Sequence, residues 1–95
     1  MTEHHQSNNA LKHYLGVAER INEIVHSPLV THAELREALD LGQAETILLG
    51  KERRFEGREG DARLARRVID SATRKAISAY TNNNNYNPLS RPKNL

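Results

Sequence analysis

The stretch Thr31–Arg54, THAELREALDLGQAETILLGKERR, decides how the rest of the chain is interpreted. Thr31 and Glu34 form a T-x-x-E capping box, in which each side chain can satisfy an unpaired backbone N–H of the first helical turn. Gly42 stands where a residue in the left-handed conformation commonly ends a helix. The stretch therefore predicts two short helices joined at Gly42.

Apolar residues recur every three or four positions on both sides of this glycine, as on one face of an amphipathic helix. They are Leu35, Ala38 and Leu39 before it and Ala44, Ile47 and Leu48 after it. Two short helices joined at a glycine are typical of a helix-turn-helix, whose second helix reads the major groove of DNA. Two packed helices of a small bundle need the same features, so this alternative stays open.

Both flanks of the central stretch also show helical periodicity. Tyr14, Val17, Ile21 and Ile24 repeat at steps of three and four, and a later run carries small apolar residues at the same spacing. We predict an all-α fold, a single small bundle of about four helices. The expected ranges are a flexible leader over 1–8, helices near 9–26, 31–41, 43–54 and 61–80, and a disordered basic tail over 81–95.

The composition limits the size and kind of core. The chain has 95 residues, of which 37% are hydrophobic and 4% aromatic, so the core must be mainly aliphatic. Its only phenylalanine, Phe55, is expected to anchor the glycine-containing loop that follows it. Because a thin core often gains burial through oligomerisation, we expect a homodimer. The expected seam is the Ala-rich face of the last helix, at Ala65, Val68, Ile69 and Ala72.

Other classes of protein are disfavoured by what the sequence lacks. Without cysteine there are no disulfides or thiolate metal sites. No apolar run approaches the length of a membrane span, and the polar N-terminus shows no secretory signal, so a cytoplasmic location is expected. The five histidines include no pair spaced four apart on a helix, and no catalytic motif is present. We therefore expect no metal, no cofactor and no enzymatic activity.

Charge is unevenly distributed along the chain. Residues 1–50 hold three basic and seven acidic side chains, a net −4, whereas residues 51–95 hold eleven basic and five acidic, a net +6. Such a split favours a polyanionic or acidic partner for the C-terminal half. Pairing of the two halves with each other, or with a second copy, explains it equally well.

Duplex DNA is the first candidate partner. On the helix-turn-helix interpretation Gln43 and Thr46 project towards base edges, because short polar side chains can hydrogen-bond them. Phosphate contacts are expected from basic residues beyond the second helix and on the last one. The candidates are Lys51, Arg53, Arg54 and Arg58 in the first group and Arg66 and Arg67 in the second, with Arg63, Arg74 and Lys75 extending the strip.

The layout resembles small phage and plasmid transcription regulators of the helix-turn-helix type. Such proteins have a leading helix, a helix-turn-helix, a closing helix that oligomerises and a loose basic tail. Four residues match the motif, Ala38, Gly42, Ile47 and Leu48, whereas Glu37 and Lys51 stand where apolar residues are expected. The resemblance implies a dimeric DNA-binding regulator.

An interaction protein is the alternative from another class. It would be a small helical inhibitor or adaptor, such as a phage-encoded one, that binds a host protein. Its arginine-rich last helix and basic tail would then meet an acidic protein surface.

Overall fold

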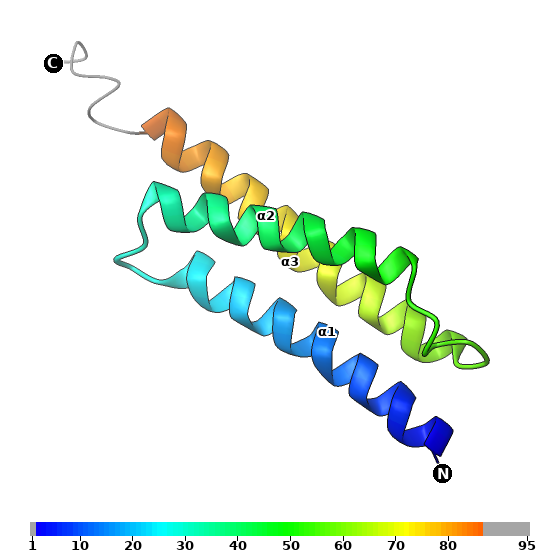
Figure 1. The fold of residues 1–95 in the computed structure, drawn as a ribbon. Coiled ribbons are helices and arrows are strands. Elements are labelled where there is room, and N and C mark those ends of the chain that lie inside the picture. The colour runs from blue at the N-terminus through cyan, green and yellow to red at the C-terminus, as the bar shows by residue number, and fades with distance from the viewer. Residues whose placement is uncertain (1, 87–95) are drawn as a thin grey trace, which may run out of the picture.

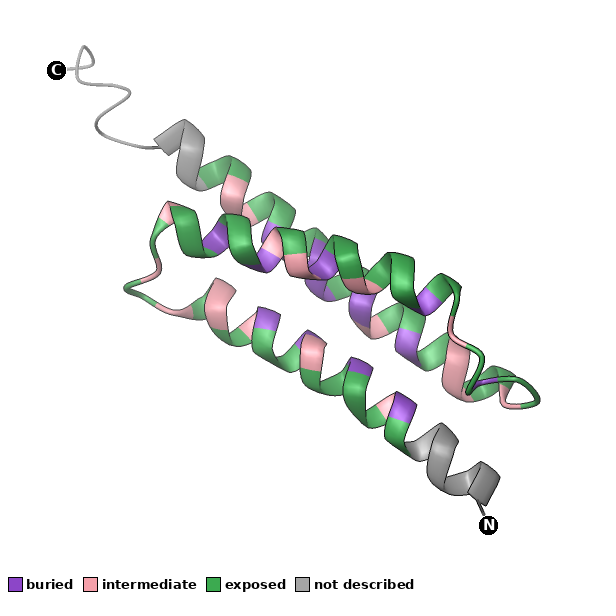
Figure 2. Cartoon of the chain, in the orientation of Figure 1, coloured by how far each residue is buried: buried purple, intermediate pink, exposed green. Residues whose placement is uncertain are grey.

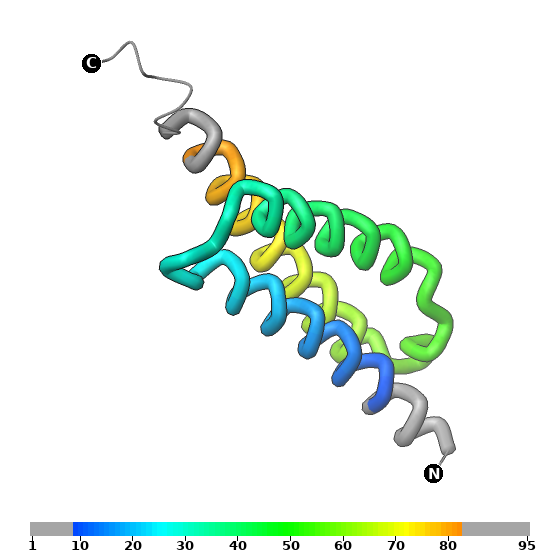
Figure 3. The backbone as a smooth tube through the Cα atoms, turned by 60° about the vertical axis from the view of Figure 1, so that its left-hand side comes forward, coloured from blue at the N-terminus to red at the C-terminus, as the bar shows by residue number. Residues whose placement is uncertain are grey.

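The computed structural model describes residues 2–86, and the side chains of residues 9–82. This part of the chain contains three α-helices and no strand: α1 (Thr2–His26), α2 (His32–Gly50) and α3 (Glu59–Tyr86). The helices run side by side, with α2 antiparallel to both α1 and α3 (Figure 1). A second view shows the same up-down-up order (Figure 3). The prediction of an all-α bundle is confirmed, but the number of helices is three rather than four.

The start of α2 follows the capping box. The Glu34 N–H donates to Thr31 Oγ1 over 3.1 Å, and the Thr31 N–H donates to Glu34 Oε1 over 2.9 Å. Each side chain thus satisfies a backbone donor that has no partner within the helix. Only a short turn separates this cap from the end of α1 at His26, which places α1 and α2 as antiparallel neighbours.

The prediction of two helices over 31–41 and 43–54 is wrong, because α2 continues through Gly42. Gly42 is buried, and Gly57 is the only glycine in the described chain with a positive φ, 81°. A Cβ at Gly42 would overlap Thr73 Oγ1 and lie 3.0 Å from Thr73 Cβ, so the missing side chain gives room for α3. The glycine marks a helix–helix contact, and the described residues contain no helix-turn-helix.

The other helix ends also differ from the predicted bounds. α1 begins at Thr2, within the stretch expected to be a leader, and α3 runs from Glu59 to Tyr86 instead of over 61–80. Extending an existing helix costs much less than starting one, and no proline interrupts α3 before Pro88. Of the predicted tail, residues 81–86 belong to α3 and residues 87–95 lie outside the described residues.

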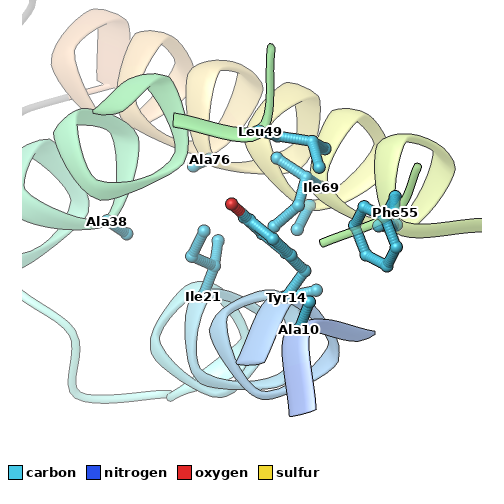
Figure 4. Close-up of a cluster of buried hydrophobic side chains, with 11 residues drawn as sticks. Ala10, Tyr14, Ile21, Ala38, Leu49, Phe55, Ile69 and Ala76 are labelled. Atoms are coloured by element: carbon cyan, nitrogen blue, oxygen red, sulfur yellow. The ribbon is translucent and has the colours of Figure 1, made fainter. Parts of the chain in front are cut away.

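The core lies where the three helices face one another, as the buried positions in Figure 2 show. Six of its eleven described side chains are alanines. Tyr14, Ile21 and Ile69 supply the bulk at its centre, together with Phe55 from the connection between α2 and α3 (Figure 4). Phe55 is buried with its ring centroid 6.1 Å from that of Tyr14, which confirms it as the anchor of this connection. The remaining members are Ala10, Ala18, Ala38, Leu49, Ala65, Ala72 and Ala76.

None of the helices in residues 2–86 has the length and apolar character needed to cross a membrane.

Candidate functional site

The two residues predicted to read base edges lie on one continuous helix rather than on a separate reading helix. Gln43 is exposed on the outer side of α2. The Thr46 hydroxyl donates to the carbonyl oxygen of Gly42 over 2.8 Å, so its proton is used within the helix. Gln43 and Thr46 were predicted on the reading helix of a helix-turn-helix, and the continuous α2 does not provide such a helix.

The basic residues of the connection between α2 and α3 are mostly engaged within the chain. Arg53 Nε lies 3.4 Å from Glu56 Oε2 in an exposed ion pair. Arg54 forms a fork with Glu52, Nε to Oε2 at 2.8 Å and Nη2 to Oε1 at 2.9 Å. Arg58 also has a partner within the chain. Of the four predicted phosphate contacts in this segment, only Lys51 is an exposed cation without a side-chain partner among the described residues.

The fork between Arg54 and Glu52 also reaches into the core. The Tyr14 hydroxyl donates to Glu52 Oε1 over 3.1 Å, linking α1 to the connection. The hydrogen bonds from Arg54 lower the pKa of Glu52 to about 2, even though burial of the carboxylate opposes this shift. Burial, with the nearby Glu52 charge, raises the pKa of Tyr14 to about 12. We refer to Tyr14, Glu52 and Arg54 as the Tyr14 latch; its tyrosine is buried and its arginine is exposed.

Three arginines of α3 differ from those of the connection. Arg63, Arg66 and Arg67 are exposed, and no hydrogen bond or ion pair involves their side chains in the described part of the molecule. One turn further on, Asp70 is taken by Arg74, whose Nε lies 2.8 Å from Asp70 Oδ2. Like charges this close repel one another, so a bound anionic group would relieve the repulsion.

The three arginines line a groove between α2 and α3 with a volume of about 430 Å³. Leu49 and Ile69 form its apolar base, and both are buried parts of the core. Thr46, Gly50 and Asp70 complete the lining. We call this the arginine groove. Its combination of an apolar base and a cationic rim suits a ligand that carries both apolar and acidic groups.

Nearby carboxylates neutralise little of the positive charge of the three arginines. Glu45 accepts from His13 over 2.9 Å, and Glu52 and Asp70 are held by Arg54 and Arg74. Glu59, one turn before Arg63, is an exposed carboxylate without a partner in the described chain. Because it is solvated, it screens the rim only weakly.

A second groove, of about 700 Å³, runs between α1 and α3 and shares Arg67 with the first. Leu15, Ala18 and Val68 form its apolar part, and Glu19 and Glu23 stand on its α1 side. Because it carries both acidic and basic side chains, this groove is less selective for an anionic ligand than the arginine groove.

The residues predicted as a dimer seam are largely used inside one chain. Ala65, Ile69 and Ala72 are buried in the core, and only Val68 lies at the edge of the second groove. Close packing of α3 against α1 and α2 explains the small side chains without a second copy.

Sequence reasoning identified Arg66 and Arg67 but not the groove that they border. The predicted break at Gly42 places Leu49 and Gly50 on a separate helix, whereas their approach to α3 depends on the continuous α2. The available signal was the seven-residue spacing of Leu35, Gly42 and Leu49, which one uninterrupted helix maintains. Among the described residues, no group of His, Asp or Glu side chains is arranged to hold a metal ion.

Comparison with protein-family models, with curated proteins and with solved structures finds no match for this chain.

Proposed function

We propose that this protein is a non-catalytic helical interaction module that binds an acidic, amphipathic segment of a partner protein in the arginine groove. The observation that carries the proposal is the set of three arginines beside an apolar base, none of which has a side-chain partner among the described residues. Carboxylates of the segment would pair with Arg63, Arg66 and Arg67. Its apolar side chains would pack against the exposed edge of Leu49 and the aliphatic stems of the arginines.

The apolar base favours a protein segment over nucleic acid. Phosphate binding needs only cations, whereas an amphipathic helix docks through apolar contacts that lie between its charged flanks. Arginine suits this role because its planar guanidinium can bind a carboxylate through two hydrogen bonds.

Duplex DNA remains the second candidate, and the row of cations on α3 is the observation that favours it. Arg63, Arg66 and Arg67 would contact phosphates there, while recognition of bases by Gln43 and Thr46 would need another geometry. In that case affinity would fall steeply between roughly 50 and 200 mM salt and would not depend on apolar groups in the ligand.

The test is fluorescence anisotropy with three probes: a Glu/Leu amphipathic peptide, a Glu/Ser peptide of equal charge, and mixed-sequence duplex DNA. We expect the Glu/Leu peptide to bind most tightly at 150 mM salt. The triple variant Arg63→Gln, Arg66→Gln, Arg67→Gln should bind it at least about tenfold more weakly, since each lost pair contributes about 0.5 to 1 kcal/mol.

A matched control removes three exposed cations that lie outside the groove, by Lys12→Gln, Arg20→Gln and Lys75→Gln. It has the same net charge as the triple variant and should bind within about threefold of the unmodified protein. Equal losses of peptide affinity in the two variants would show that net charge alone determines binding, and would contradict the proposed site. Tighter binding of the DNA than of both peptides would favour the second candidate, a DNA-binding protein.

A further inference from the structure

The outer face of α2 carries apolar side chains that nothing in the described chain covers. Ile47 is 62% exposed and Leu48 is 52% exposed, and the exposed Ala44 lies one turn before Leu48. Full burial of a Val, Leu or Ile side chain is favourable by about 1.5 to 3 kcal/mol. Covering Ile47 and Leu48 would therefore contribute substantially to the free energy of association. Ala44, Ile47 and Leu48 do not line the arginine groove, whose α2 residues are Thr46, Leu49 and Gly50.

Charged residues bracket this patch with opposite signs at its two ends. Asp40, Ala44, Ile47 and Lys51 follow one another at steps of four, three and four, which places them in one stripe along α2. Asp40 and Lys51 are both exposed. The face therefore reads, along the helix, as acidic, apolar and basic.

A face with this order is complementary to itself only when two copies meet in antiparallel fashion. Antiparallel packing centred between Ala44 and Ile47 sets Ala44 against Ile47 of the second copy and Asp40 against Lys51 of the second copy. Twofold symmetry repeats both pairings. Parallel packing would instead set each charge against its own kind, which is unfavourable.

We propose that the protein forms an antiparallel homodimer through the outer face of α2, with Ala44, Ile47 and Leu48 at its centre. This surface differs from the α3 seam expected from the sequence, and it does not depend on the proposed peptide-binding function. Arg36 Nε donates to both oxygens of Asp40, over 3.1 Å to Oδ1 and 3.3 Å to Oδ2. That pair is solvent-exposed, and each carboxylate oxygen keeps a second lone pair that can accept from Lys51 of the second copy. The contact covers about three helical turns, roughly 16 Å, so we expect dissociation in the micromolar range.

Sedimentation equilibrium of the full chain from low to high micromolar concentration tests this proposal. The unmodified protein should pass from monomer to dimer. Ile47→Gln with Leu48→Gln should raise the dissociation constant at least about tenfold, through loss of apolar burial. Both positions are more than half exposed in the monomer, so at low concentrations where both proteins are monomeric the helical circular dichroism and the thermal midpoint should hardly change.

Charge reversal tests the antiparallel arrangement separately. Asp40→Lys should weaken the dimer, and Asp40→Lys with Lys51→Asp should restore it, because the exchanged charges again face their opposites. A monomer at every concentration would overturn the proposal, as would a dimer unaffected by the Ile47 and Leu48 substitutions. Failure of the double reversal to restore a dimer that single reversal weakens would overturn the antiparallel pairing.

Discussion

Replacing Gly42 with alanine is expected to lower the free energy of unfolding by about 2 to 3 kcal/mol. The added Cβ would overlap Thr73 Oγ1 and lie 3.0 Å from Thr73 Cβ and 3.1 Å from Thr73 Cγ2, so α2 and α3 would have to separate. At an exposed helical position the same change is favourable by about 1 kcal/mol. Urea unfolding followed by circular dichroism measures the difference.

Gly16→Ala is the matched control. Gly16 is also helical, but it is exposed and a Cβ there would have nothing within 4 Å. We expect this variant to be more stable than the unmodified protein by about 0.5 to 1 kcal/mol, since alanine loses less conformational freedom on folding. Two glycine-to-alanine changes in helices should thus act in opposite directions.

Substitution of Thr73 identifies the origin of the Gly42 effect. Thr73 is buried, and its Oγ1 has no hydrogen-bond partner in the described part of the chain, so Thr73→Ala removes a hydroxyl whose burial is unfavourable. In a Gly42→Ala background it should recover more than about 1 kcal/mol, a coupling expected only between residues in contact. If the two changes are additive, the glycine acts through local backbone conformation and the contact with α3 is not what requires it.

Two local signals in the sequence predict the structure correctly, although local patterns misplace the start of α1 and both ends of α3. The Thr31 capping box and the anchoring role of Phe55 follow from short-range patterns, and both are confirmed. Gly42 was interpreted wrongly because a glycine at a helix end and one at a helix crossing look alike in a single sequence. The residue that decides between them is Thr73, which lies on another helix.

The arginine groove shows the same limit for function. The sequence reveals a basic face on α3, but not which arginines already have partners. Arg54 pairs with Glu52, and Arg58 has another contact within the chain. Arg63, Arg66 and Arg67 have no side-chain partner among the described residues and can bind a ligand. This distinction depends on how the connection between α2 and α3 folds back over Tyr14, which no helical periodicity predicts.

Because of the Tyr14 latch, the free energy of unfolding should fall as the pH becomes acidic. The pKa of Glu52 is about 2 in the folded chain, below the ordinary value of 4.5, so the folded state holds the carboxylate charged. The associated stabilisation is complete above pH 4.5 and is lost as the pH falls from 4.5 towards 2. A shift of this size corresponds to at most about 3 kcal/mol, and water around the partly exposed Arg54 reduces it, so we expect about 2 kcal/mol.

Glu52→Gln should therefore unfold about 2 kcal/mol more easily than the unmodified protein at pH 7, because Arg54 loses its anionic partner. The difference between the two proteins should shrink below pH 4.5 and nearly vanish near pH 2, where about half of the Glu52 carboxyls are protonated even in the folded chain. Glu56→Gln is the control from the same connection. Its pair with Arg53 is solvent-exposed, so we expect a change below about 0.5 kcal/mol at every pH. A Glu52 variant that matched the Glu56 variant throughout the pH series would show that the latch does not stabilise the fold.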